Sequence, residues 1–427
     1  MLAQLWLANK RPTRSSSILI KQGDPPPVAQ ATTYLDHNAT APLRPEAREA
    51  MVAAMDALAG GGNPSSAHRA GRVARRIVED ARASVASLLA AVPDEVVFTS
   101  GGTEANSLAI TGTLASGAVE RLIVVATEHA SVIDTAAASG VDVKQLGVDS
   151  DGMADIAALV DDLQTDTRPA LVCVMASNNE TGAVQPVLQI TQCVKEAGGR
   201  VHVDAVQHVG KLPLSPLGGA HTMAISAHKI GGPQGVGALV VRGKGRVEPM
   251  LRGGGQELRR RAGTENVVGI AGFGAAADKA AESQAQLQAL APLRDELEAR
   301  ALQIADATGH VGAVICPAAE RLPNTSCIAF DGVKAETLLM ALDLGGVCVS
   351  SGSACSSGKV ARSHVLEAMG INESRAGGAI RVSMGWNTTD QDIERFCSAL
   401  EQALKRIRPV DAGHVSSDGH AARTAGE

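Results

Sequence analysis

The feature that most constrains this chain is an alternation of short apolar segments and helical segments between residues 96 and 241. Strands rich in Val and Ile are predicted at 96–99, 122–127, 141–145, 170–176, 201–203, 222–226 and 237–241. Helices are predicted before and between them, at 45–58, 67–89, 104–114, 131–138, 155–163 and 187–196. This alternation is typical of a mostly parallel sheet that helices cover on both faces. We therefore predict an α/β fold.

The composition fits such a fold and excludes several other classes. Aromatic residues make up only 2% of the chain, so the core must consist of Ala, Val, Leu and Ile. Because the chain has 39 basic and 45 acidic residues, it carries no net positive charge that would favour nucleic acid or an anionic membrane as a partner. No apolar run approaches the roughly 20 residues of a membrane helix. We predict a protein that binds neither nucleic acid nor membrane.

The cysteines indicate a reducing compartment. The chain has seven, without the paired CxxC spacing of a zinc site, so neither a metal site nor a disulfide framework is predicted. Free thiols persist in reducing compartments, which favours a cytoplasmic location. An organelle is the alternative if residues 1–33 are a transit peptide.

The 427 residues are long enough for two domains. After residue 275 the pattern changes to a long Ala/Gln/Glu/Leu-rich helix at 276–307, followed by strands at 327–330, 347–350 and 379–383. In the last helix, Thr388 and Gln391 have the spacing of a capping box. We predict a large α/β domain at 51–275 and a smaller α+β domain formed by 34–50 and 276–408.

The two ends lack a patterned apolar face. Residues 1–33 are rich in Arg and Ser and poor in acidic residues, as in an organellar transit peptide. The alternative, which we favour, is a disordered extension from an upstream start codon. Residues 409–427 are polar and small, which is typical of a disordered tail.

Polar side chains follow four of the predicted strands. Because parallel strands end at the same edge of a sheet, where α/β proteins bind ligands, we expect these side chains to form one site. They are His129 after strand 122–127, Asn179 after 170–176, Asp204 and Gln207 after 201–203, and Ser226, His228 and Lys229 after 222–226.

Two strand-end segments, one of those four and one after strand 96–99, indicate specific chemistry. Lys229 lies between an apolar strand and a Gly-Gly-Pro turn, where partial loss of hydration lowers the pKa of the amine and frees it for Schiff-base formation. Taken alone, a lysine in this position is more typical of a solvated strand end. Gly102 and Thr103 begin the helix after strand 96–99, and a helix N-terminus binds anions such as phosphate.

The set of side chains fits pyridoxal phosphate, which stabilises carbanions next to an amine. A carboxylate at Asp204 suits a protonated ring nitrogen, and the imidazole of His129 can stack on an aromatic ring. An amide such as that of Gln207 can hydrogen-bond a phenolate. Lys229 would then supply the amine.

Eight segments resemble cysteine desulfurases of the NifS/IscS branch of the class V aminotransferase-like enzymes. They cover residues 34 to 408 in the family's order. They are 34–40 (YLDHNAT), 62–68 (GNPSSAH), 127–129 (TEH), 178–182 (NNETG), 202–207 (HVDAVQ), 227–229 (AHK), 261–266 (RAGTEN) and 350–355 (SSGSAC).

The resemblance implies a homodimer with the fold of pyridoxal-phosphate-dependent transferases (fold type I). It implies that Lys229 holds the cofactor and shuttles protons, while Asn179 and Arg381 bind the substrate carboxylate. The cofactor-binding residues that it implies are Gly102, Thr103, His129, Asn179, Asp204, Gln207, Ser226, His228, Lys229 and, from the other subunit, Thr264.

Cys355 lies in a segment without apolar anchors, between Gly352 and Gly358. The sequence therefore predicts an exposed, mobile loop, in which Lys359 and Arg362 favour the thiolate. The resemblance implies that Cys355 attacks the sulfur of the substrate and carries it as a persulfide. The segment after residue 409 does not resemble the acceptor-docking end of the housekeeping branch.

The implied activity is conversion of L-cysteine to L-alanine, with sulfur passed to an acceptor protein such as an iron–sulfur scaffold. Two alternatives remain at this point. One is another class V enzyme, such as a selenocysteine lyase. The other is a catalytically silent scaffold for sulfur transfer.

Overall fold

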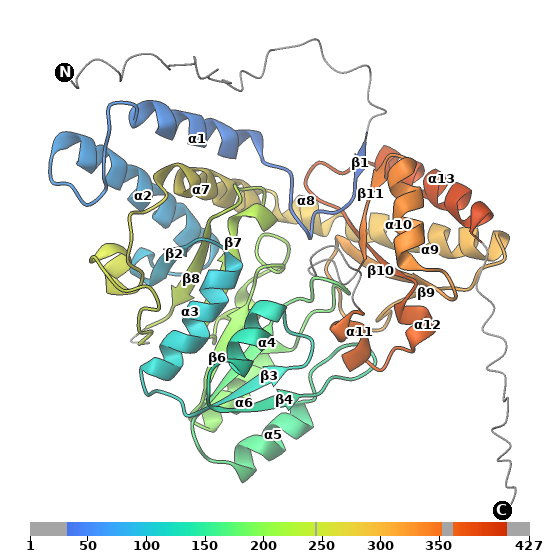
Figure 1. Ribbon diagram of the computed structural model, residues 1–427, viewed down its shortest axis with the longest axis horizontal. Helices are drawn as coiled ribbons and strands as arrows, with labels where there is room; N and C mark the ends of the chain where they lie inside the picture. The colour runs from blue at the N-terminus through green and yellow to red at the C-terminus, as the bar shows by residue number, and fades with distance from the viewer. Residues whose placement is uncertain (1–31, 244–245, 352–361, 408–427) are drawn as a thin grey trace, which may run out of the picture. The chain divides into compact units, whose positions relative to one another are not determined.

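The computed structural model describes residues 32–243, 246–351 and 362–407 (Figure 1). The described residues from Thr33 onward belong to one compact unit. They contain a seven-stranded sheet, a four-stranded sheet and a separate strand pair. Within the described residues, no helix is long and apolar enough to cross a membrane.

The large sheet has the order β2-β8-β7-β6-β5-β3-β4. All neighbouring strands are parallel except β8, which is antiparallel to β7 and to β2. This confirms the predicted α/β fold with a mostly parallel sheet. The strands are β2 (Val96–Thr99), β3 (Arg121–Val125), β4 (Asp142–Leu146), β5 (Ala170–Met175), β6 (Arg200–Asp204), β7 (Thr222–Ser226) and β8 (Gly237–Val241).

Helices cover both faces of the large sheet because its inner strands are apolar on both sides. On one face, Leu239 and Val241 of β8 pack with Leu108 of α3; on the other, Val240 of β8 packs with Phe273 of α7. The helices of this part are α1 (Pro45–Ala57), α2 (Arg69–Leu88), α3 (Gly102–Ala115), α4 (Ala130–Ala137), α5 (Ile156–Thr165), α6 (Val187–Glu196) and α7 (Val267–Glu282).

The small sheet has the order β12-β13-β10-β9 and is antiparallel. Its core includes Phe330, Ile380 and Phe396. The strands are β9 (Gly312–Val314), β10 (Thr325–Phe330), β12 (Ser350–Ser351) and β13 (Ala379–Ser383), and β1 (Thr33–Tyr34) pairs with β11 (Val347–Cys348) nearby. The helices are α8 (Gln284–Gln288), α9 (Ala291–Ala307), α10 (Ala335–Leu344), α11 (His364–Ala368), α12 (Glu373–Ala376) and α13 (Asp390–Arg406). The described residues also contain four short 3-10 helices: η1 (Pro93–Glu95), η2 (Ser215–Leu217), η3 (Ala227–Lys229) and η4 (Gln256–Arg259).

The single long helix predicted at 276–307 is wrong, because the structure has three helices, α7, α8 and α9, over 267–307. The chain leaves α7 at Ser283, whose hydroxyl bonds the carbonyl of Lys279. Pro292 is the second residue of α9, where its missing N–H costs nothing. Ala276 and Ala280 pack in the core of the large sheet, so the expected boundary at residue 276 falls inside α7. The division into two domains stays a prediction.

The capping box of the last helix lies one residue later than predicted. Thr389 is the N-cap of α13, and both its backbone N–H and its hydroxyl donate to Asp392. The hydroxyl of Thr388 instead accepts from the N–H of Gly385. The residue that completes the capping box at the third helical position is therefore Asp392, whereas the sequence analysis expected Gln391.

The segment after β1 joins the two sheets. Its residue His37 donates its N–H to the carbonyl of Ser383 in β13, and Ala41 donates to the carbonyl of His228 after β7. Backbone hydrogen bonds thus hold this segment between the end of β7 and the small sheet. That position makes residues 38 and 39 part of the site described next.

Candidate active site

A cavity of about 360 Å³ lies at the ends of the central strands of the large sheet. All the predicted site residues except Thr264 and Cys355 line it. They are Gly102, Thr103, His129, Asn179, Asp204, Gln207, Ser226, His228, Lys229 and Arg381. Asn38, Asn106 and Ser131, which the sequence did not single out, also line the cavity.

The two remaining residues are not in this cavity. Thr264 is exposed on the chain just before α7 and does not line the cavity of its own chain. Cys355 falls in 352–361, outside the described residues. The roles expected for both stay predictions.

Lys229 ends the 3-10 turn η3, which follows the fully buried strand β7. Its Nζ donates to the backbone carbonyls of Asn38 and Ala39, each at 2.7 Å. Gly231, two residues later, has a φ of 87°, a conformation that glycine adopts without strain. The turn thus aims the amine across the cavity towards the segment that joins the sheets.

His228 supplies a neutral donor or acceptor beside the lysine. Its Nδ1 lies 3.1 Å from the hydroxyl of Thr40. Burial, and then the positive charge of Lys229, lower the pKa of His228 to about 4. At neutral pH this imidazole is therefore uncharged, and it can hydrogen-bond an anion.

The N-terminus of α3 provides an anion-binding end. Gly102 is its first residue and Thr103 its second. A Cβ on Gly102 would lie 2.9 Å from Cγ2 of Val206, so a larger residue would collide with the loop after β6. With the hydroxyl of Ser226, which is at the end of β7, these groups form a set suited to a phosphate.

Asp204, at the end of β6, is held by two donors. Nδ2 of Asn106 donates to its Oδ2 at 2.7 Å, and the N–H of Val206 donates to its Oδ1 at 3.0 Å. The oxygen of the same amide, Oδ1 of Asn106, lies 3.0 Å from Nε2 of His202. Burial lowers the pKa of His202 to about 4, so this histidine is neutral. The carboxylate is thus fixed in place by groups that do not compete for its charge.

His129 is fixed through the same network. It is the N-cap of α4, and its Nδ1 accepts the N–H of Ser131 at 3.1 Å. The hydroxyl of Ser131 accepts from Nδ2 of Asn106 at 2.9 Å. Because Nδ1 is an acceptor, the proton of the neutral ring is on Nε2. The ring plane is therefore set before any ligand binds.

Arg381 is the contribution of the small sheet. It lies on β13 and is 3% exposed, and two acceptors among the described residues hold its guanidinium. Nη2 donates to Oδ1 of Asp36 at 2.8 Å, and Nη1 donates to the carbonyl of Asn179 at 3.1 Å. Among the described residues, its Nε has no hydrogen-bond partner. A buried donor without a partner is suited to an incoming carboxylate.

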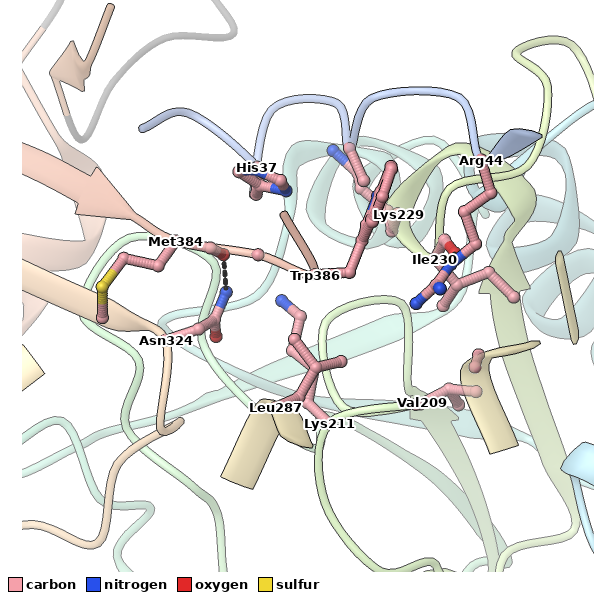
Figure 2. Close-up of a pocket in the computed structure, with 14 residues that line it drawn as sticks. His37, Arg44, Val209, Lys211, Lys229, Ile230, Leu287, Asn324, Met384 and Trp386 are labelled. Carbon is pink, nitrogen blue, oxygen red and sulfur yellow. Dashed lines mark hydrogen bonds between the residues drawn. The ribbon is translucent and has the colours of Figure 1, made fainter. Parts of the chain in front are cut away.

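A second lysine near the site was missed by the sequence analysis. Lys211 is 5% exposed and, with Lys229, lines a second, small cavity of about 20 Å³ (Figure 2). Its spacing of four residues from Gln207 was the available signal, since a helical turn brings such residues together. Asn106 was also detectable, as an amide one turn after Thr103 in the helix that begins at the predicted anion-binding end.

Comparisons with known proteins agree with this geometry. The family model of class V aminotransferases matches residues 33–396. A cysteine desulfurase of Cereibacter sphaeroides is 43% identical over 384 residues, which are 88% of this chain and 97% of that protein. The cysteine desulfurase IscS of Dictyoglomus turgidum is 39% identical over 388 residues, 88% of this chain and 95% of that protein. The crystal structure of a NifS-like protein from Rickettsia africae superposes with a TM-score of 0.78 at 33% identity, covering 87% of this chain and 99% of that one.

Proposed function

Because this chain belongs to the class V aminotransferase family, and within it to the pyridoxal-phosphate-dependent cysteine desulfurases, we propose that it takes sulfur from L-cysteine onto Cys355 and releases L-alanine. The observation that carries this proposal is the cavity of about 360 Å³ that the predicted residues share. Residues from strand ends that are far apart in sequence meet there around Lys229, together with an arginine from the other sheet.

The residues around the cavity fit pyridoxal phosphate. The phosphate would lie at the N-terminus of α3, with Thr103, Ser226 and His228 as side-chain donors. Asp204, held by Asn106, would pair with the ring nitrogen, and His129 would stack on the ring. Gln207 would face the ring oxygen. The neutral state of His228 fits this arrangement, because it leaves charge compensation of the phosphate to the N-terminus of α3.

Each side chain then has a defined task. Bound pyridoxal phosphate withdraws electrons from the Cα of an amino acid joined to it. Arg381 and Asn179 bind the carboxylate of L-cysteine and so orient its Cα towards Lys229. Lys229 removes the Cα proton and returns protons as alanine forms. The Cys355 thiolate attacks the sulfur of the substrate, which breaks the carbon–sulfur bond and leaves a persulfide on Cys355.

We further propose a cytoplasmic homodimer. Thr264 is exposed in this chain, which suits a residue that completes the phosphate site of a second subunit. The persulfide would pass its outer sulfur to an acceptor protein, for which an iron–sulfur scaffold is our first candidate. The described cysteines are all free, which suits a reducing compartment.

The test is to measure alanine and persulfide formed from L-cysteine by the parent and by Cys355→Ser. We expect the variant to keep the colour of the cofactor and to form neither product, because a hydroxyl does not replace a thiolate in this attack. Cys348→Ser, which changes a half-buried cysteine of β11, is the matched control and should retain both products. Alanine release by Cys355→Ser at the parental rate would remove Cys355 from the reaction and favour a general lyase such as a selenocysteine lyase.

A further inference from the structure

We propose that Lys211 is a positioning residue that fixes which end of the Gln207 amide faces the cofactor cavity. The inference rests on the proposed function in one respect, namely that Gln207 faces the ring oxygen of pyridoxal phosphate. Lys211 itself does not line that cavity. It would act on the cofactor only through Gln207.

The contacts of Lys211 are short and buried. Its Nζ donates to Oε1 of Gln207 at 2.7 Å and to Oδ1 of Asn38 at 2.9 Å. Figure 2 shows Lys211, Lys229 and Asn324 around the small cavity. Burying an amine among amide oxygens, away from solvent, costs free energy. The hydrogen bonds of the amine offset part of this cost and fix the orientation of the amides.

The direction of both amides follows from backbone carbonyls, which can only accept. Nε2 of Gln207 donates to the carbonyl of Asn38 at 2.9 Å, so its Oε1 must be the atom that meets Lys211. Nδ2 of Asn38 donates to the carbonyl of Asn179 at 3.2 Å and to the hydroxyl of Thr325 at 2.9 Å. Its Oδ1 is therefore left for Lys211 and for Nδ2 of Asn324 at 3.3 Å.

This orientation decides what Gln207 offers to a ligand. With Oε1 occupied by Lys211, the polar group left for the cavity is the second N–H of Nε2. A deprotonated ring oxygen requires a donor, so this direction favours the bound cofactor. Without Lys211, Oε1 would be a buried acceptor short of a donor, and the hydrogen bond from Nε2 to the carbonyl of Asn38 would be left alone to oppose a flip of an amide with little torsional preference of its own.

A direct electrostatic effect of Lys211 is the alternative that the experiment must separate. Burial lowers the pKa of Lys211 well below its usual value, and the charges of Lys229 and Arg381 lower it further. His37 and His208 are the other titratable groups that sense it, since Lys211 contributes to their lowered pKa values. Lys211 and Lys229 also share Asn38, whose carbonyl accepts from Lys229.

The test is a double-mutant cycle read by the visible absorbance of the holoenzyme as pH is varied. The absorbance changes where the Lys229–cofactor linkage loses its proton. A donor to the ring oxygen favours the deprotonated linkage. Lys211→Met should therefore raise the midpoint by about one pH unit. Gln207→Ala should raise it similarly. In the Gln207→Ala background, Lys211→Met should add almost nothing, because its effect passes through the missing amide.

Two outcomes would overturn the proposal. One is an unchanged midpoint in Lys211→Met with Gln207 present, and the other is an equal shift in the Gln207→Ala background, which would show a direct charge effect. If Lys211→Met does not bind the cofactor, Lys211→Leu, which also lacks a donor, takes its place in the cycle. The readout requires bound cofactor but no turnover, so a protein without desulfurase activity would still decide the question.

Discussion

The cavity has one wall formed by the large sheet and one formed by the small sheet, and the two differ in how their polar groups are hydrogen-bonded. On the large-sheet wall, polar groups are bonded to one another: Asn106 contacts Asp204, Ser131 and His202 at once. On the small-sheet wall, the main polar group is the guanidinium of Arg381, held by Asp36 and by the carbonyl of Asn179. Among the described residues its Nε has no partner.

This difference indicates what each wall is for. A network whose members satisfy one another keeps its shape with or without a ligand, which suits a cofactor that stays bound. A buried donor that lacks a partner gains most when an anion arrives, which suits a substrate that binds and leaves. The comparison therefore separates cofactor binding from substrate binding, and the following changes test that separation.

The largest effect should come from removing the reactive group of the large-sheet wall. Lys229→Ala removes the amine that moves the Cα proton, so alanine formation should fall at least about a thousandfold. The absorbance of a lysine-linked cofactor should disappear as well. Both are measured on the purified variant after incubation with pyridoxal phosphate. A lysine-linked spectrum equal to that of the parent would show that another amine holds the cofactor.

The large-sheet wall should also carry a pH-dependent stability. His202 has a pKa of about 4 in the native protein because it is buried, against 6.5 for a free histidine. Between these values the unfolded chain binds a proton that the native protein does not, so the free energy of unfolding falls as pH decreases from 6.5 to 4. The full contribution is on the order of 3 kcal/mol.

Urea unfolding at several pH values measures this contribution. His202→Gln, which retains a polar side chain but cannot take up the proton, should flatten the pH dependence in that window. An identical pH dependence in parent and variant would contradict the neutral state assigned to His202. The histidines His37 and His228, whose pKa values are also about 4, would continue to contribute in the variant.

A substitution in the small-sheet wall should weaken substrate binding and leave the cofactor bound. Arg381→Leu removes the charge-assisted hydrogen bonds to the substrate carboxylate, so kcat/KM for L-cysteine should fall about a hundredfold, mainly through KM. Arg375→Leu, which breaks a comparable pair with Asp331, is the control and should leave KM unchanged. Loss of cofactor absorbance in Arg381→Leu would mean that the two walls are not separable.

The smallest effect should come from the carboxylate behind Arg381. Asp36 accepts from Arg381 through Oδ1 and from the hydroxyl of Ser350 through Oδ2, at 2.7 Å. Asp36→Asn keeps the shape of the side chain but weakens its hydrogen bond with the guanidinium of Arg381. KM for L-cysteine should therefore rise by less than about tenfold. Steady-state kinetics measures the rise. A rise as large as that of Arg381→Leu would show that Asp36 is essential to the substrate site and not merely an anchor.

Much of the large-sheet wall could be predicted from sequence, because parallel strands end at one edge. His129, Asp204 and Lys229 each follow an apolar strand directly, so the sheet itself brings them together. Arg381 was assigned from the resemblance, since nothing local in β13 distinguishes it from a solvated strand residue. The roles of Cys355 and Thr264 remain predictions, as residues 352–361 and a second subunit lie outside the structure.

The errors have a common physical cause. The helix predicted at 276–307 failed because Ala, Gln and Leu continue with the same composition across the breaks at Ser283 and Leu290. Lys211 was missed because its contacts with Gln207 and Asn38 depend on how a turn folds against a distant segment. Periodicity describes one element at a time, whereas both features arise where elements meet.

The segment between β1 and α1 has a consequence for biosynthesis. It closes the cavity through contacts between residues 345 positions apart, such as Asp36 with Arg381 and Asn38 with Ser383. Closing a loop of this length costs conformational entropy, so such contacts form late in folding. On the ribosome, the segment emerges early and must wait for β13, which is near the end of the described chain. We therefore expect the nascent chain to acquire a competent cofactor site only after nearly all of it has been synthesised.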